Sequence, residues 1–118
     1  MQLQEIRFEN VQPVDGYGPG FFRVGGTVLE GAVIVTATGA RCWAGLEDEA
    51  ALLALAGEID VLLIGTGAEI AFLDAPLRRR LEEVGLGVET MGSPSAARTY
   101  NVLLAEGRRV AAALLPVT

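Results

Sequence analysis

The sequence predicts an α/β layered domain in which a largely parallel central sheet is joined to an N-terminal β meander. The first third of the chain contains short strand-like runs separated by glycine-rich turns, and the remainder alternates helix and strand three times. Residues 61–64 form an uninterrupted aliphatic run, which is typical of a strand buried on both faces. No linker, repeat or low-complexity tract divides the chain, so we expect residues 1–118 to form one domain.

The front of the chain is predicted to be a meander of short strands. Polar and apolar residues alternate from Leu3 to Phe8, as in a half-exposed strand. Residues 12–20 are rich in glycine and proline, and we predict a turn throughout this stretch. Short strands are then expected at residues 21–24, 27–29, 31–36 and 41–43.

Three helices, each followed by a strand, are predicted after Trp43. The acids at 47–49 open the first helix, which Gly57 ends before a strand at 59–64. Asp74 is the expected N-cap of the second helix, whose buried stripe is predicted to contain Leu77, Leu81 and Val84. A strand at 86–91 follows. Ser93 is the expected N-cap of a third helix, and a final apolar strand is predicted at 110–117.

The composition excludes several function classes. The net charge of −6 argues against nonspecific nucleic-acid binding, because neutralising phosphates requires a basic surface. The chain has no histidine, so Ser-His and Cys-His nucleophile pairs and imidazole metal sites are excluded. Cys42 is the one cysteine, and we expect it to be a small packed residue. We therefore assign no catalytic residue, no metal ligand and no cofactor, and we favour a protein that is not an enzyme.

The chain is expected to be a cytoplasmic, soluble protein. No apolar run approaches the ~20 residues that a membrane-spanning helix needs. The first residues carry neither a basic segment nor a long apolar core, so we expect no secretory signal.

Two loops are predicted to line one crevice at the edge of the sheet. In open α/β sheets, ligands bind beyond the carboxyl ends of parallel strands. Gly65-Thr66-Gly67 and Gly92-Ser93 each follow a predicted strand, and the two loops would meet if those strands are neighbours. Helix amides, a hydroxyl and a guanidinium could there hold an anion or carboxylate. The predicted ligand-binding residues are Gly65, Thr66, Gly67, Ser93, Arg98, Thr99 and Asn101.

Structural roles account for the same residues, and we favour them. Ser93 can serve as an N-cap, Thr99 can return its hydroxyl to the preceding turn, and Asn101 can bond a loop carbonyl. A dinucleotide site is disfavoured, because Ile70 occupies the position of the third glycine in a GxGxxG motif and no helix starts directly at the turn.

Three segments, in this order along the chain, carry a family resemblance. They are Gly16-Tyr17-Gly18-Pro19-Gly20-Phe21, Leu62-Leu63-Ile64-Gly65-Thr66-Gly67 and Arg98-Thr99-Tyr100-Asn101-Val102-Leu103-Leu104-Ala105-Glu106-Gly107-Arg108-Arg109-Val110. They resemble the Mth-like domain family of unknown function, which includes the mitochondrial complex I assembly factor 3 and the adipogenesis-associated Mth-like domain protein. The resemblance covers nearly the whole chain and implies a three-layer α/β fold with a mixed central sheet. Ser93 stands where that family usually has threonine, so the hydroxyl is kept.

The resemblance implies a role in protein assembly, although a shared fold does not by itself transfer function. The mitochondrial member acts as an assembly chaperone beside the inner membrane. We therefore predict a bacterial interaction or assembly factor that is not an enzyme, with respiratory or membrane-complex subunits as partners and a place in the cytoplasm or at the inner-membrane surface. The alternative is a small-molecule or anion-binding protein, with weak enzymatic activity, that uses the crevice at residues 65–67 and 93–101.

Overall fold

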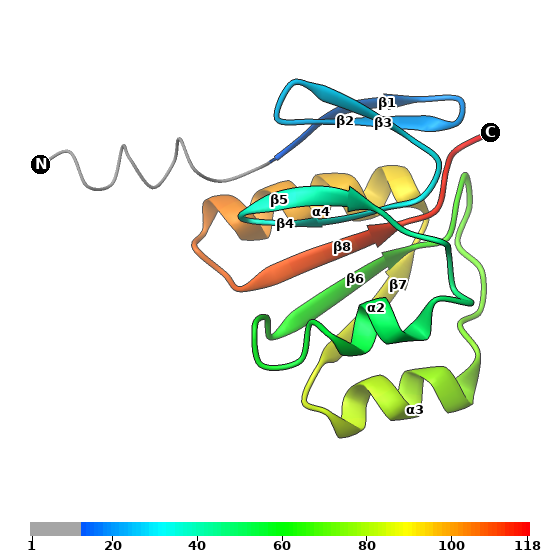
Figure 1. Ribbon diagram of the computed structural model, residues 1–118, viewed down its shortest axis with the longest axis vertical. Coiled ribbons are helices and arrows are strands. Elements are labelled where there is room, and N and C mark those ends of the chain that lie inside the picture. Colours follow the sequence, from blue (N-terminus) through cyan, green and yellow to red (C-terminus); the bar gives the residue numbers. More distant parts are fainter. Residues whose placement is uncertain (1–12) are drawn as a thin grey trace, which may run out of the picture.

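Five strands form a mixed central sheet in the order β5-β4-β8-β6-β7, and three form an antiparallel meander in the order β1-β2-β3. The computed structural model describes residues 13–118, and the strand predicted from Leu3 to Phe8 lies outside them. The strands are β1 (Val14–Gly18), β2 (Phe21–Val24), β3 (Thr27–Glu30), β4 (Val33–Thr36), β5 (Gly39–Cys42), β6 (Val61–Gly65), β7 (Gly87–Met91) and β8 (Val110–Leu114). The helices are α2 (Glu49–Leu53), α3 (Ala75–Glu83) and α4 (Ser93–Ala105) (Figure 1).

β6 lies between two parallel neighbours, β7 and β8. Its side chains Leu62, Leu63 and Ile64 are at most 1% exposed, so the predicted strand buried on both faces is confirmed. On its other side β8 pairs antiparallel with β4, and β4 pairs antiparallel with β5. The sheet is therefore parallel in the β8-β6-β7 half and antiparallel in the β5-β4-β8 half.

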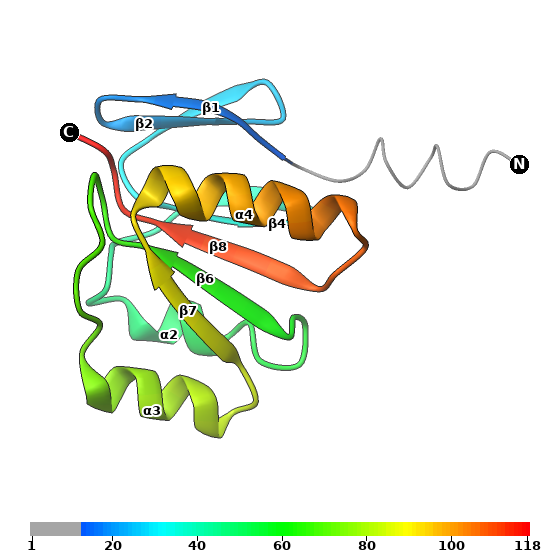
Figure 2. The same cartoon turned by 180° about the vertical axis from the view of Figure 1, so that it is seen from behind.

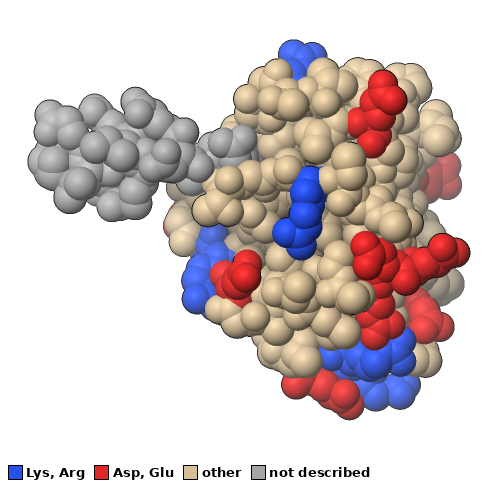
Figure 3. All heavy atoms as spheres, viewed as in Figure 1, with Lys and Arg blue, Asp and Glu red and all other residues tan. Residues whose placement is uncertain are grey.

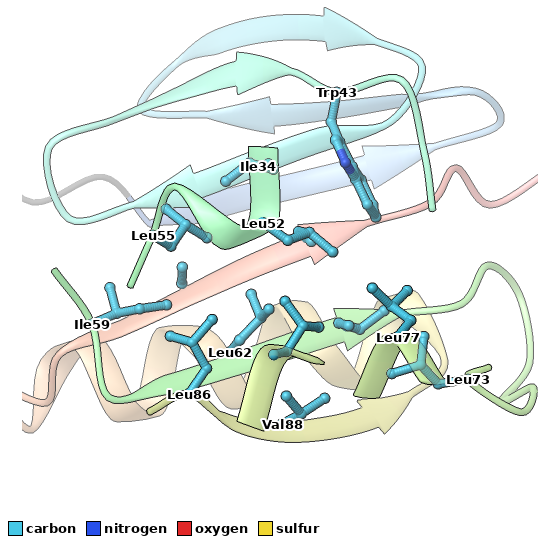
Figure 4. Packing of buried hydrophobic residues seen from close by; sticks show 14 residues of the cluster. Ile34, Trp43, Leu52, Leu55, Ile59, Leu62, Leu73, Leu77, Leu86 and Val88 are labelled. Carbon is cyan, nitrogen blue, oxygen red and sulfur yellow. The ribbon is translucent and has the colours of Figure 1, made fainter. Parts of the chain in front are cut away.

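Alternate side chains of β6 enter two different cores. Leu62 and Ile64 belong to a cluster that includes Trp43, Leu52 and Leu77, so α2 and α3 cover this face of the sheet (Figure 4). A second cluster lies on the opposite face, where α4 and the meander cover the sheet (Figure 2). It contains Leu63 of β6, Phe22 and Val24 of the meander, and Ala96, Ala97 and Tyr100 of α4. The fold is thus a three-layer α/β arrangement.

The ends of α3 follow the predicted local chemistry at its start and depart from it at its finish. The Leu77 amide donates to Asp74 Oδ2 at 3.3 Å, which confirms Asp74 as the N-cap of α3. Val84 was predicted in the buried stripe, but it is 43% exposed because α3 ends at Glu83 and the helical period no longer applies to it.

Among the described residues no helix combines the length and the apolar composition that crossing a membrane requires.

Two predictions about the front third are wrong. Val14–Gly18 is a strand and not a turn, since it pairs with β2, and the Phe21 ring lies so close to Gly18 that a Cβ there would be 2.5 Å from it. The absence of a side chain at Gly18 therefore leaves room for the Phe21 ring beside the strand. Cys42 is exposed and not packed, because β5 is the outer strand of the central sheet.

Replacing Leu63 by alanine should lower the free energy of unfolding by about 2–5 kcal/mol, because the truncation leaves a cavity in a fully packed site. Urea denaturation measures the loss. The matched control is Val28→Ala on β3, where the side chain is 56% exposed. A loss for Leu63→Ala no larger than that of the control would contradict the central placement of β6.

Candidate functional site

The carboxyl end of β6 and the start of α4 are in direct contact. The Ser93 hydroxyl accepts a hydrogen bond from the Gly67 amide at 2.9 Å and donates one to the Leu115 carbonyl at 2.6 Å. The Ser93 amide donates to the Gly67 carbonyl at 2.6 Å. Ser93 is fully buried, and it joins the loop after β6 to the segment after β8. The prediction that the two loops meet is correct in its geometry, and their meeting is a hydrogen-bonded junction.

The junction depends on the missing side chain of Gly65. A Cβ at this position would lie 2.7 Å from Ser93 Oγ and 2.8 Å from Ser93 Cα, closer than real Cβ contacts come. Glycine therefore allows β6 and α4 to touch. The Leu115 amide also donates to the Gly65 carbonyl at 2.9 Å, so main-chain bonds hold all three segments at this corner.

The helix start differs from the prediction. Ser93 was expected to cap α4 with its hydroxyl, but Gly92 is the N-cap and no side chain bonds the first helical amides. Ser93 is the first helical residue, and its hydroxyl turns away to Gly67 and Leu115. The assignment of Ser93 as a side-chain N-cap is thus wrong, because long-range partners use the hydroxyl instead.

Asn101 and Arg98 do not reach this junction. The Asn101 amide group donates to the Val14 carbonyl and accepts from the Val14 amide, both at 2.9 Å, as a neighbouring β-strand would do. It thereby holds the first strand of the meander against α4. Arg98 is exposed and its Nη2 lies 3.3 Å from Ser95 Oγ, while Thr99 is half-buried. The structure brings together residues 65–67 and 93, and it gives Arg98 and Asn101 separate partners.

Thr66 braces the loop that follows β6. Its hydroxyl donates to the Glu69 carbonyl at 2.7 Å and accepts from the Ala71 amide at 2.9 Å. Its own amide bonds the Met91 carbonyl of β7 at 2.9 Å. These bonds give residues 66–71 a defined shape without a helix or strand.

The same loop exposes two large apolar side chains. We call residues 66–74 the β6–α3 loop, and in it Phe72 is fully exposed and Ile70 is 66% exposed. Leu73, directly after them, is buried in the core cluster under α3. The loop is therefore anchored at both ends, by Thr66 and by Leu73, and presents an aromatic side chain to solvent. Exposed apolar side chains that lie together mark contact sites more often than isolated ones do.

Sequence reasoning did not identify Ile70 and Phe72 as exposed residues. The available signal was an apolar stretch, Ile70 to Leu73, inside a segment that had to be a loop. The sequence alone does not show which apolar residues of such a stretch are buried and which are exposed, because apolar side chains are by default expected to be buried.

An ion pair between Arg80 and Glu49 links helices α3 and α2. Arg80 bonds both carboxylate oxygens of Glu49, with Nη2 at 2.7 Å from Oε1, and so links α3 to α2. The hydrogen bond from Arg80 lowers the pKa of the half-buried Glu49 carboxyl. In the other core, burial raises the pKa of the Tyr100 hydroxyl. The described part of the chain contains no group of three or more acidic, cysteine or histidine side chains placed to hold a metal.

Comparison with known proteins gives a family match and several relatives. Residues 14–115 match the model of a family described as a protein of unknown function (DUF498/DUF598). An uncharacterised protein of Rhodobacter capsulatus is 53% identical over 117 residues, which cover 99% of this chain and 94% of that protein. The NADH dehydrogenase (ubiquinone) 1 alpha subcomplex assembly factor 3 of Danio rerio is 33% identical over 107 residues. The match covers 85% of this chain and 62% of the fish protein, so this chain spans less than two thirds of that relative.

Solved structures share the fold. A crystal structure from Bartonella henselae, described as an outer membrane protein, has a TM-score of 0.84 and 38% identity and covers 93% of this chain and 98% of that one. A solution structure of a Bordetella pertussis protein, described as a Mth938-like domain, has a TM-score of 0.75 and 32% identity, with coverages of 89% and 85%. The fold is therefore Mth938-like.

Replacing Ser93 by alanine should lower the free energy of unfolding by about 1–3 kcal/mol, because the Gly67 amide and the Leu115 carbonyl lose a buried partner. Chemical denaturation measures the change. Ser95→Ala, on the exposed side of the same helical turn, is the control and should change stability by less than about 0.5 kcal/mol. Equal stability of the two variants would show that the junction does not hold the corner together.

Proposed function

This chain belongs to the family of proteins of unknown function DUF498/DUF598, and we propose that within it the chain acts as an assembly factor, not an enzyme, for respiratory membrane complexes. The relation to the fish complex I assembly factor is distant and supports this role by analogy. The observation that carries the proposal is the exposure of Phe72 and Ile70 on the braced β6–α3 loop.

The loop has the properties of a contact site for a protein partner. Aromatic anchors that enter a pocket on the partner supply much of the binding energy of an interface. Burying an exposed phenylalanine side chain gains about 1.5–3 kcal/mol. The hydrogen bonds of Thr66 hold the loop in shape before binding, so less conformational entropy is lost when the partner arrives.

The charge of the chain favours a protein partner over a lipid surface. The net charge is −6, and the cytoplasmic face of a membrane attracts basic segments and repels acidic ones. Figure 3 shows acidic groups gathered at the end of the molecule where α2 begins. We place the protein at the inner-membrane surface through its contact with a subunit and not through lipid headgroups.

Phe72→Ser should reduce the assembly of respiratory complex I in the host. A strain that lacks the gene should show reduced NADH:quinone activity in its membranes, and the wild-type chain should restore it. Phe72→Ser should restore much less, because the loop loses its apolar anchor while the core is unchanged. Affinity capture with the wild-type chain should recover complex I subunits, and capture with Phe72→Ser should recover several-fold less.

Val28→Ser is the matched control, since Val28 is also exposed but lies on β3, and it should behave as wild type. Normal activity in the strain without the gene, together with capture of no respiratory subunit, would refute the assembly role. Recovery of subunits in equal amounts by wild type and Phe72→Ser would refute the role of the loop alone.

Anion binding is our second proposal, and it rests on the exposed pairing of Arg98 with Ser95 at the first turn of α4. The contacts support it less than the first, because Gly67, Ser93 and Asn101 already have partners within the chain. Phosphate and succinate are suitable probes. At about ten times the dissociation constant, a bound anion should raise the melting temperature by about 5 °C. The rise should vanish in Arg98→Ala and persist in Arg108→Ala. No rise with either probe would refute this proposal.

A further inference from the structure

The outer edge of β5 has backbone hydrogen-bonding groups that nothing in the described chain uses. The Trp43 amide donates to the Ala32 carbonyl at 2.9 Å, so the β4–β5 ladder continues one step beyond β5. In an antiparallel pair, successive residues of a strand direct their backbone groups alternately toward and away from the partner. Because the backbone amide of Trp43 points toward β4, the backbone groups of Arg41 point toward β4 as well. The amides and carbonyls of Ala40 and Cys42 therefore point outward, away from the sheet.

A hollow lies beside this edge, with a volume of about 210 Å³. It is lined by Ile34, Thr36, Thr38, Gly39, Ala40 and Arg41. Figure 1 shows that α2 and α3 lie toward β6 and β7 and do not cover β5. The meander contacts β5 on the other face, where Leu29 of β3 and Ala40 of β5 pack against the same cluster. The hollow thus provides a shallow place for a side chain next to a free strand edge.

Arg41 gives this place a charge preference. Among the described residues the ion pairs involve Arg78, Arg80 and Arg109, so Arg41 is an exposed guanidinium without an acidic partner there. In the sheet it lies opposite Ile34, which is buried and neutral. Figure 3 shows a basic group over β5 whose immediate surroundings are uncharged. A carboxylate is the group that best complements an unpaired guanidinium.

We propose that the outer edge of β5 binds an extended, acidic segment of a partner protein, which adds a strand to the central sheet and places a carboxylate at Arg41. Strand addition of this kind takes its affinity from main-chain hydrogen bonds and its specificity from side-chain pockets. The proposal goes beyond the function proposed above, because this edge is separate from the β6–α3 loop and does not need Phe72.

A second copy of the chain fits this edge less well than an acidic segment. Two β5 strands paired antiparallel about Arg41 would bring two like charges together, and like charges placed opposite each other destabilise a strand pair. A charged residue on an edge strand is also a common protection against pairing between copies. The test therefore has to distinguish two roles of Arg41: binding a carboxylate of a partner, and preventing the pairing of two copies of the chain.

The test uses the full chain and two blocked nonapeptides of alternating valine and threonine, one with a central glutamate and one with a central lysine. The glutamate peptide should bind about tenfold more tightly, since one peptide gains a surface ion pair and the other meets repulsion. Amide hydrogen exchange read by NMR should slow at Ala40 and Cys42 when the glutamate peptide binds. Exchange at Arg41 and Trp43 should stay as it is, because those amides already bond β4.

Two variants at Arg41 test whether this residue sets the preference for the glutamate peptide. Arg41→Gln should bind the two peptides with equal affinity, and Arg41→Glu should bind the lysine peptide more tightly than the glutamate peptide. Arg23→Gln, which removes an exposed arginine from β2, is the control and should leave the preference unchanged. Phe72→Ser should also bind the glutamate peptide as wild type does, so failure of this proposal is distinguishable from failure of the assembly role.

The proposal is overturned if the glutamate peptide gives no protection at Ala40 and Cys42 at about millimolar concentration. It is also overturned if Arg41→Glu binds both peptides as wild type does, since Arg41 would then only protect the edge. A concentration-dependent dimer formed through β5 without peptide, measured by sedimentation, would assign the edge to a second copy and overturn it as well.

Discussion

The two apolar strands at the middle of the sheet set the architecture. β6 and β8 have no charged side chain, and Leu62, Ile64 and residues 111–113 are almost fully buried. A strand that is apolar on both sides must be covered on both faces. Helices α2 and α3 supply one cover, and α4 with the meander supplies the other. Burial of the apolar strands requires a layer on this face, and the two hydrogen bonds between Asn101 and Val14 orient the meander within it.

The corner at the carboxyl end of β6 connects this core to the surface. Gly65 and Ser93 close the space at the strand end, so the chain leaves the sheet from a rigid point. Thr66 shapes the next five residues, and Leu73 returns the chain to the core. Such an arrangement is how a rigid scaffold positions a surface loop. The hydroxyls that sequence patterns suggested as ligand groups act here on the chain itself, while the groups open to a partner are Ile70 and Phe72.

Sequence reasoning succeeds here where a local pattern decides the outcome. Asp74 caps α3 because its partner is three residues away, and the strand at 61–64 is recognisable from its own side chains. It fails where the deciding neighbour is distant. Val14 begins a strand that Asn101 holds from 87 positions away, and Ser93 is bound by residues 26 and 22 positions away. The two loops that were predicted to line a crevice do meet, and whether this place binds a ligand stays a prediction.

The position of β8 has a consequence for biosynthesis. β8 (residues 110–114) lies between β4 and β6, and it follows every other described strand along the chain. Before β8 is synthesised, no strand connects the β4–β5 pair to the β6–β7 pair. Contacts between segments far apart in sequence form late, since closing long loops costs entropy. The central sheet therefore completes only after β8, the last of its strands in chain order, has been synthesised, and until then the apolar faces of β4 and β6 depend on partial folds or chaperones for protection.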